Sequence, residues 1–126
     1  MKQNILEQLL KDRAAKTAVA LATALDGGEQ ALIYHDRTLG PLASRDGVVE
    51  AAIKALQDDK SRIVSIDSGD IFVQVFNPPL RMILVGAVHI AQPLSRMAAV
   101  AGYDVSVVDP RESFATPERF PNVNLV

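Results

Sequence analysis

The chain has 126 residues, a formal net charge of −2 at pH 7 and no cysteine. The small negative charge gives no electrostatic case for a nucleic-acid partner or for an anionic membrane surface. Without cysteine, this chain cannot form disulfides, thiolate metal sites, a cysteine nucleophile or a persulfide carrier. Its two histidines, His35 and His89, cannot by themselves make a closed zinc site.

The sequence shows neither a membrane segment nor an export signal. It contains no tract of about 20 apolar residues. The N-terminal stretch MKQNILEQLLKDR carries charges within its apolar part, unlike a cleavable signal peptide. These features predict a cytoplasmic protein whose length suits one ordinary domain or two small ones.

The first part of the chain predicts two helices and two hairpins. Helices are expected over residues 2–16 and 48–57, where apolar residues recur at helical spacing, and Asp46 is a candidate cap for the second. Strands over 17–25 and 31–35 are joined by the turn DGGEQ. Strands within 61–76 flank the turn Ser68-Gly69-Asp70, and 36–47 is expected to be a loop. The predicted inward faces are Ile5, Leu6, Leu9, Leu10 and Ala14 in the first helix, and Val48, Ala52 and Leu56 in the second.

A domain boundary is expected at Asn77-Pro78-Pro79. Proline has no amide donor and biases the residue before it to an extended conformation, so this triplet interrupts both helix and strand. Residues 1–77 therefore predict a small α+β domain, and residues 80–126 begin a second one.

The second segment predicts the first strand–helix–strand unit of a Rossmann-like parallel sheet. Met82 to Val85 is a short apolar strand, and strands of this kind are typical of parallel sheets covered by helices. A helix is expected to start near Ile90 and to stop at Gly102, followed by the strand DVSVVD and a possible third strand at 123–126. The fold class is thus α/β, with an apparently incomplete sheet. The predicted inward face of the helix is Ile90, Leu94, Met97, Ala98 and Ala101.

The turn after the first of these strands resembles a dinucleotide-binding fingerprint. That fingerprint is G-x-G-x-x-G/A after a strand, with an acid about 20 residues further on. Residues 86–91 read G-A-V-H-I-A, and Asp109 ends the next strand. Val88 stands where the second glycine lets the pyrophosphate approach the backbone. The pattern indicates the fold but argues against NAD as ligand. Gly86 and Asp109 also have purely structural interpretations, as turn residues.

A longer motif resembles the XdhC/CoxI family, the accessory proteins of xanthine dehydrogenase and carbon monoxide dehydrogenase. The family's second domain has a G-A-G-H-[VI]-A segment, a V-x-V-x-D strand end and a loop F-A-[TS]-x-E-R-F-P. The corresponding segments here are GAVHIA (86–91), VSVVD (105–109) and FATPERFP (114–121). The resemblance spans roughly residues 80–123.

The resemblance implies an accessory protein rather than an enzyme, and no residue is an evident nucleophile or general base. Family members are thought to bind the molybdenum cofactor, protect it, help its sulfuration and hand it to an apo molybdenum hydroxylase such as xanthine dehydrogenase. The family's G-S-[ST]-P-R segment and its cysteine are missing between Ala18 and Phe76. The missing cysteine puts direct cofactor ligation and sulfur handling in doubt.

A molybdopterin, or its dinucleotide form, would be held at the turn after the first strand. Its phosphate would meet amides at the helix N-terminus, and Asp109 would accept a bond from a ribose hydroxyl. Arginine side chains would make bidentate contacts to phosphate. No catalytic residue and no metal ligand are predicted. The predicted cofactor-binding residues are Gly86, Ala87, Val88, His89, Asp109, Arg111 and Arg119.

Two alternatives stay open: an NAD(P)-dependent oxidoreductase fragment, and a regulatory or structural relative without a ligand. The FATPERFP loop favours the accessory protein over the oxidoreductase. Val88 and the missing cysteine favour the relative without a ligand over the accessory protein. Because a single helix can cover only one face of the predicted sheet, the chain is also expected to form a homo-oligomer through residues 80–126, by a two-fold contact. The alternative is that the first domain covers the free face.

Overall fold

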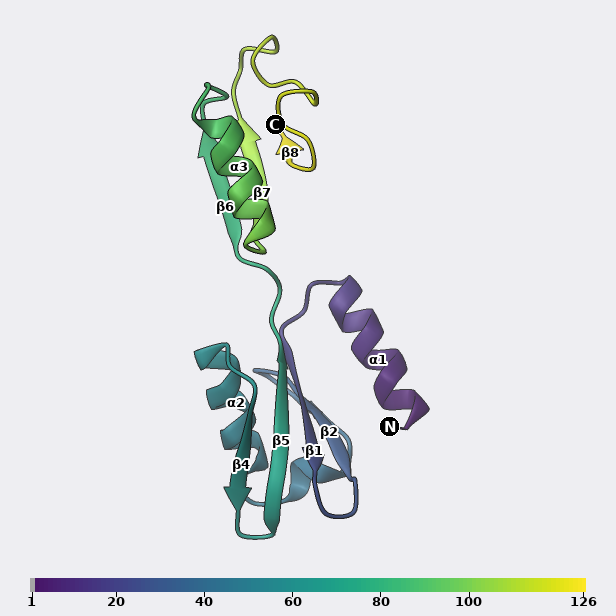
Figure 1. Ribbon diagram of the computed structural model, residues 1–126. Helices are drawn as coiled ribbons and strands as arrows, with labels where there is room; N and C mark the ends of the chain where they lie inside the picture. The colour runs from purple at the N-terminus through teal and green to yellow at the C-terminus, as the bar shows by residue number, and fades with distance from the viewer. Residues whose placement is uncertain (1) are drawn as a thin grey trace. The chain divides into compact units, whose positions relative to one another are not determined.

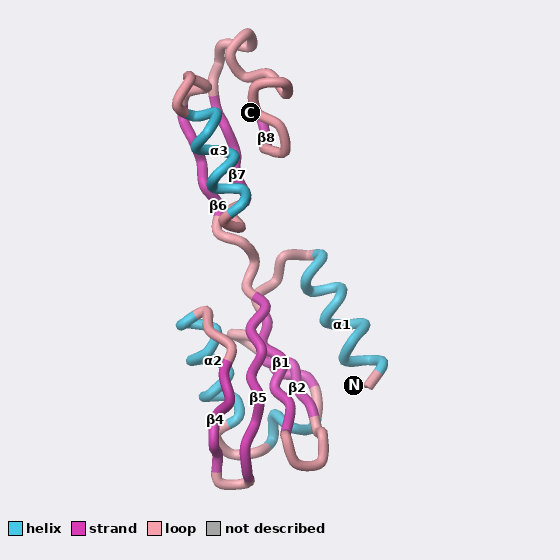
Figure 2. Tube along the Cα trace, viewed as in Figure 1, coloured by secondary structure: helices cyan, strands magenta, loops and turns pink. Residues whose placement is uncertain are grey.

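The computed structural model describes residues 2–126 and divides the chain into two compact units, the first ending at Pro78 and the second starting at Pro79 (Figures 1 and 2). The elements of the first unit are α1 (Gln3–Ala14), β1 (Val19–Ala24), β2 (Gln30–Ile33), β3 (Thr38–Leu39), the 3-10 helix η1 (Pro41–Ser44), α2 (Val48–Asp58), β4 (Arg62–Ile66) and β5 (Gly69–Phe76). Those of the second are β6 (Arg81–Val85), α3 (Ala91–Val100), β7 (Asp104–Val108) and β8 (Asn124–Leu125). No helix within residues 2–126 is long and apolar enough to cross a membrane.

The first unit is built on an antiparallel sheet with the strand order β3-β2-β1-β5-β4. Both predicted hairpins are confirmed, β1 with β2 and β4 with β5. The long central pairing of β1 with β5 runs from Val19 opposite Phe76 to Ala24 opposite Ile71. The segment expected to be a loop holds β3 and η1, which are too short to show a hydrophobic period.

Helix α2 covers one face of this sheet. Its predicted inward residues Val48, Ala52 and Leu56 are all buried, as expected from their helical spacing. Small side chains at alternate positions of the central strand β1 let the helix approach closely. The buried cluster on this face consists of Ala20, Ala22, Ala24, Ala31, Ile33, Leu42, Val48, Ala52, Ala55, Leu56, Ile71 and Val73.

The predicted cap of α2 is wrong. The residue that caps the helix is Gly47, which has no side chain to accept a bond, and no side-chain cap bond is formed. Asp46 lies one residue too early, because the helix begins at Val48 with Gly47 in a left-handed conformation (φ 87°).

Helix α1 packs against the other face of the sheet, through a narrower stripe than expected. Ile5 and Leu9 are buried, whereas Leu6 and Leu10 are 43% and 56% exposed. The inward position one turn beyond Leu9 is taken by Asp12, which is also buried. The prediction that Leu6, Leu10 and Ala14 face inward is therefore wrong, since all three are exposed and the buried Asp12 carboxylate takes part of that face.

The Asp12 carboxylate can be buried because Tyr34 supplies it with a hydrogen-bond donor. The Tyr34 hydroxyl donates to Asp12 Oδ2 (2.5 Å), and Gln8 Nε2 donates to Oδ1 (3.0 Å). Arg37 lies over the Tyr34 ring, 4.1 Å from its centroid. Burial and the bond to Asp12 together raise the pKa of Tyr34 to about 12.

The raised pKa of Tyr34 predicts a loss of stability in alkali. The neutral phenol is the favoured form, so its contribution is complete below the unfolded pKa near 10 and is lost as the pH rises toward about 12. In a Tyr103→Phe chain, tyrosinate absorbance reports Tyr34 alone, because the chain has two tyrosines. The absorbance should rise near pH 12, together with unfolding of the first unit. A transition complete by about pH 10 would contradict the buried bond.

The second unit is an α/β structure with a parallel three-stranded sheet in the order β6-β7-β8. The predicted third strand is confirmed as β8, which pairs with β7 in parallel register. Helix α3 covers one face, and its predicted stop is confirmed at Gly102, whose φ is 95°. On the opposite face Ile83 and Val85 of the edge strand β6 are 56% and 85% exposed. The buried cluster of this unit is Ala87, Ala91, Val107 and Phe120.

The predicted inward face of α3 is largely wrong. Of the predicted residues only Ala98 is buried, together with Ser95 and Ala91, which lie one and two turns before it. Ile90, Leu94 and Met97 are 72%, 41% and 67% exposed, and Ala101 is exposed as well. The helix meets the sheet through small side chains, since large residues of the strands and Phe120 already fill the interface. Its large apolar residues consequently point to solvent.

Candidate functional site

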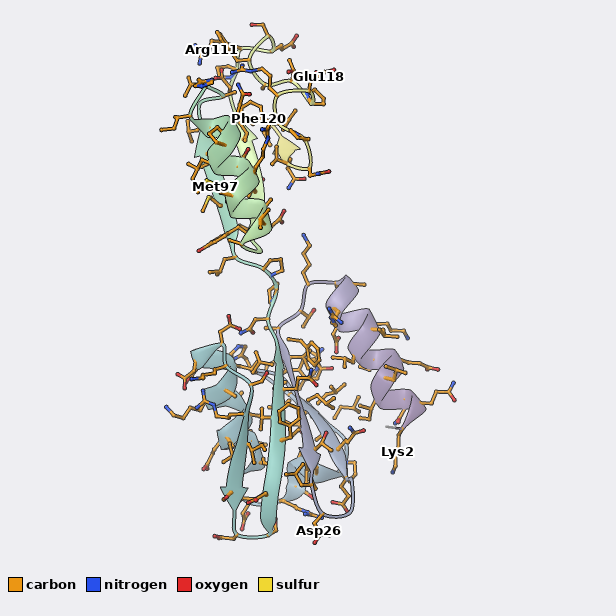
Figure 3. All side chains as sticks on the ribbon, in the orientation of Figure 1. Lys2, Asp26, Met97, Arg111, Glu118 and Phe120 are labelled. Carbon is orange, nitrogen blue, oxygen red and sulfur yellow. The ribbon has the colours of Figure 1, made fainter. Side chains whose placement is uncertain are left out.

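The predicted site residues lie at the carboxyl ends of β6 and β7. The turn 86–90 follows β6, and the loop 109–121 follows β7, which runs beside β6 in parallel. Figure 3 labels Arg111, Glu118 and Phe120 in this loop. In open parallel sheets, ligands bind at this end of the strands. The structure thus brings the two predicted segments to one end of the second unit.

The turn after β6 leaves three amides facing no acceptor. Gly86 has a φ of 102°, a conformation that favours glycine, and its amide donates to Val108 O (2.8 Å). The next amide, of Ala87, donates to Asp109 Oδ2 (2.8 Å). Within residues 2–126, the amides at 88, 89 and 90 then donate no hydrogen bond, and α3 has no side-chain cap. Three free amides at a helix start are suited to an anionic oxygen.

Both carboxylate oxygens of Asp109 accept hydrogen bonds from other groups of the protein. Its side chain is 1% exposed. Besides the bond from Ala87, it accepts bonds from the Arg111 amide (2.9 Å), Nε (2.9 Å) and Nη2 (2.7 Å). The Arg111 guanidinium and these backbone amides hold the pKa of the Asp109 carboxyl well below its usual range. The carboxylate therefore fastens the turn after β6 to the loop after β7.

The loop after β7 is fixed by a second arginine. Arg119 Nη1 donates to Phe114 O (2.7 Å). With the Gln92 amide turned so that its oxygen faces Arg119, that oxygen accepts from Nε (3.0 Å) and Nη2 (2.9 Å). Both guanidiniums lie over the Phe114 ring, that of Arg111 at 4.2 Å and that of Arg119 at 5.5 Å from its centroid. Arg119 therefore holds the loop against the start of α3, and Arg111 holds it to Asp109 at the end of β7.

The described residues form no metal centre. Across residues 2–126, no group of three histidine, aspartate or glutamate residues lies close enough to hold an ion. His89 is exposed at the start of α3, and His35 is exposed after β2 in the other unit. The site thus has polar donors for an anion and no cluster of metal ligands.

The sequence of this unit matches a known domain. Residues 82–125 match the XdhC Rossmann domain. The match includes the turn, α3, β7 and the loop that carries both arginines, so the site described here lies entirely within the XdhC Rossmann segment.

Two further comparisons extend over more of the chain. The chain is 30% identical over 89 residues to the uncharacterized protein YqeB of Escherichia coli (strain K12), over 59% of this chain and 16% of YqeB. A crystal structure described as a xanthine dehydrogenase from Bacillus halodurans shares its fold, with a TM-score of 0.67 and 19% identity. That likeness covers 98% of this chain and 36% of the other. The chain thus spans well under half the length of both proteins.

Sequence reasoning missed three residues that shape this site. Phe120 is 1% exposed and packs against Ala87 of the turn, Phe114 contacts both arginines, and Gln92 accepts hydrogen bonds from Arg119. Both phenylalanines lie in the FATPERFP motif, so their place in that motif was a usable signal. Gln92 carried no such sequence signal, because its partner Arg119 is 27 positions away and only the fold brings the two side chains together.

Breaking the Asp109 bonds should loosen this end of the unit. In Asp109→Asn, the amide group cannot match the two-pronged, charge-assisted contact with Arg111. Hydrogen exchange of the Ala87 amide should then speed up by roughly tenfold or more, because its acceptor is weakened. Arg111→Lys is the matched change in the other partner of this ion pair. It should also speed up hydrogen exchange of the Ala87 amide. Unchanged exchange in both variants would show that the pair does not fasten the turn.

Proposed function

We propose that this chain is part of an accessory protein of a molybdenum hydroxylase of the xanthine dehydrogenase type. In this proposal it binds the molybdenum cofactor and passes it to the apo-enzyme. The carrying observation is the match of residues 82–125 to the XdhC Rossmann domain. The chain spans only 16% of YqeB and 36% of the solved xanthine dehydrogenase chain. Delivery of the cofactor to the apo-enzyme would therefore also need segments that correspond to the rest of those proteins.

The residues present fit the phosphate end of the cofactor. The free amides at 88, 89 and 90 would hold phosphate oxygens, and the exposed His89 side chain stands beside them. When bound, the cofactor supplies the molybdenum and its redox chemistry. This chain offers that metal no cysteine. Its own contribution is to bind and orient the phosphate, while Asp109 keeps the turn in shape.

The binding step can be tested with the purified chain and molybdopterin released from a molybdoenzyme. After desalting, retained pterin is oxidised and measured by fluorescence. Val88→Asp places a carboxylate beside the free amides and should lower retention at least about tenfold, since it repels phosphate. Leu25→Asp makes the same charge change at an exposed position of the first unit and should retain pterin normally. No retention by the unaltered chain, or equal retention by both variants, would overturn the proposal.

The second candidate is a relative that has lost its ligand. The observation that favours it is the mutual engagement of Asp109, Arg111 and Arg119 with the loop and the helix start. Under this alternative the charged groups have only a structural role. Failure of the chain to retain either a pterin or a nicotinamide dinucleotide would support it.

NAD and NADP are expected to bind weakly or not at all. Val88 occupies the position where the fingerprint needs glycine, and its branched side chain, 45% exposed, would crowd the bridging pyrophosphate of a dinucleotide, whereas a terminal phosphate needs only the free amides at 88, 89 and 90. Calorimetric titration measures this directly, and low-micromolar binding would contradict it. Val88→Gly should strengthen binding of any dinucleotide that the turn accepts.

A further inference from the structure

Donors of the protein itself fill the acceptor positions of the Asp109 carboxylate. An ionised carboxylate offers about four lone-pair positions, two on each oxygen. Oδ1 accepts from the Arg111 amide and from Arg111 Nε, both at 2.9 Å. Oδ2 accepts from Arg111 Nη2 (2.7 Å) and from the Ala87 amide (2.8 Å). The side chain is 1% exposed, so a further donor binds Asp109 only by displacing one of these groups.

Asp109 stands where a dinucleotide-binding fold places its ribose acceptor. The order β8-β7-β6 is the strand order 3-2-1 of the first mononucleotide-binding half of such a fold. In that half, an acid at the end of the second strand accepts a bond from the 2′-hydroxyl of the ribose. Asp109 directly follows β7, which is the second strand here. The acceptor is therefore in the right place for a ribose, but the chain already occupies it.

The Arg111 guanidinium makes the contact that a ribose would make. Its Nε and Nη2 bridge the two carboxylate oxygens, as two adjacent hydroxyls of a ribose would. A charged, planar donor pair binds a carboxylate more strongly than neutral hydroxyls do, so a ribose does not displace it. The Phe114 ring also lies against the guanidinium, 4.2 Å from it, and keeps it in this place. Figure 3 labels Arg111 at this end of the second unit.

We propose that Arg111 is a specificity-determining residue that closes the nucleoside position of this turn by taking the place of the ribose. It excludes ligands with a ribose beside the phosphate, whatever binds to the free amides at 88, 89 and 90. Val88 acts on the bridging pyrophosphate and Arg111 acts on the sugar, so that two separate residues exclude a nucleotide. The inference concerns the sugar alone and does not depend on the pterin ligand proposed above.

Removing the guanidinium should reopen the ribose acceptor. In Arg111→Ala, each carboxylate oxygen loses one side-chain bond, while the Ala87 amide still donates to Asp109 Oδ2. The Arg111 side chain is 52% exposed, so its removal lets water reach the carboxylate and leaves no buried charge without a partner. The variant is therefore expected to fold. Arg111→Lys is the milder form of the change, because a lysine keeps the charge but lacks the fork that bridges both oxygens.

Titration with ADP and with 2′,3′-dideoxy-ADP tests the inference, because these nucleotides differ only in the ribose hydroxyls. Amide NMR signals of residues 86–91 in the full chain report binding, and those of β6 and β7 report folding. Val88→Gly is the starting variant, since a glycine lets the pyrophosphate approach the backbone, and it should bind both nucleotides alike. Adding Arg111→Ala should make ADP bind at least about tenfold more tightly than dideoxy-ADP, because its hydroxyls then donate to a carboxylate with free positions.

Val88→Gly combined with Arg96→Ala is the matched control. Arg96 is exposed on α3, so the same charge is removed outside the Asp109 bonds, and the two nucleotides should again bind alike.

Three results would overturn the proposal. A folded Val88→Gly/Arg111→Ala chain that binds the two nucleotides alike, or binds neither, would show that Arg111 does not close the position. A Val88→Gly chain that already prefers ADP tenfold would show that Asp109 reaches a ribose with Arg111 in place. If the alanine variant does not fold, Val88→Gly/Arg111→Lys decides instead. It should prefer ADP to a smaller extent, and equal binding of both nucleotides would again overturn the proposal.

Discussion

Replacing Phe120 by alanine is expected to unfold most of the second unit at room temperature. Phe120 is 1% exposed and is the largest member of the cluster with Ala87, Ala91 and Val107. Its ring fills the space between the loop, the turn and α3. The neighbouring Ala87, Ala91 and Val107 are too small to fill the cavity that its removal would leave. Truncating a buried phenylalanine costs about 3–5 kcal/mol. A unit spanning residues 79–126 has a total stability of only roughly 2–7 kcal/mol.

Phe114→Ala provides the matched control, six positions earlier in the same loop. Phe114 is 39% exposed and contacts the two arginines rather than the core. Its truncation should leave the second unit folded. Amide hydrogen exchange, followed separately for the two units, measures the difference. If β6 and β7 stay protected in Phe120→Ala, the ring is not what holds the loop and the turn together.

The hairpins of the first unit were predictable because their signals are local. Turn residues at 26–30 and around Ser68 fall between apolar runs, and antiparallel neighbours need only a short connection. The strand β3 was not predictable, because two residues carry no period. The buried Asp12 was not predictable either. Its partner Tyr34 lies 22 positions further along the chain, and only the packing of α1 on β2 brings them together.

The existence of α3 was predictable, and its orientation was not. Ala91, Ser95 and Ala98 recur at helical spacing just as Ile90, Leu94 and Met97 do. Hydrophobicity alone favours burying the larger set. The sheet instead accepts the smaller set, because the strands and Phe120 already supply the volume. Periodicity identifies a helix with two apolar sides but does not say which side meets the sheet.

The same distinction applies to the candidate site. The place of Gly86 and Asp109 at the ends of two adjacent strands follows from the strand–turn–helix–strand order, which a sequence shows. The hydrogen-bond partners of Asp109 do not follow from that order. Its engagement by Arg111 and the Ala87 amide depends on how the loop folds back over the turn. That the two arginines also contact a phosphate stays a prediction from the sequence, since in the structure Arg111 binds Asp109 and Arg119 binds Phe114 O and Gln92.

The first unit depends equally on one residue, Gly40, which is expected to tolerate no side chain. Gly40 has φ 108° and ψ 160°, a region that is essentially restricted to glycine. A Cβ there would lie 2.7 Å from Gln30 O and 3.0 Å from Ala31 Cα, both backbone atoms of β2. Since the sheet cannot yield at its second strand without losing its pairing with β1, Gly40→Ala should cost roughly 3 kcal/mol or more.

Gly27→Ala separates the steric part of this cost from the backbone part. Gly27 has a φ of 92°, but a Cβ there meets no heavy atom within 4 Å. It should therefore show only the strain of the left-handed backbone, about 1–2 kcal/mol. Urea unfolding of the two variants, followed by circular dichroism, measures the difference. The excess cost at Gly40 reports how closely η1 is pressed against β2. Equal losses in both variants would mean that the chain before η1 moves away from the sheet, and that the close approach is not needed for the fold.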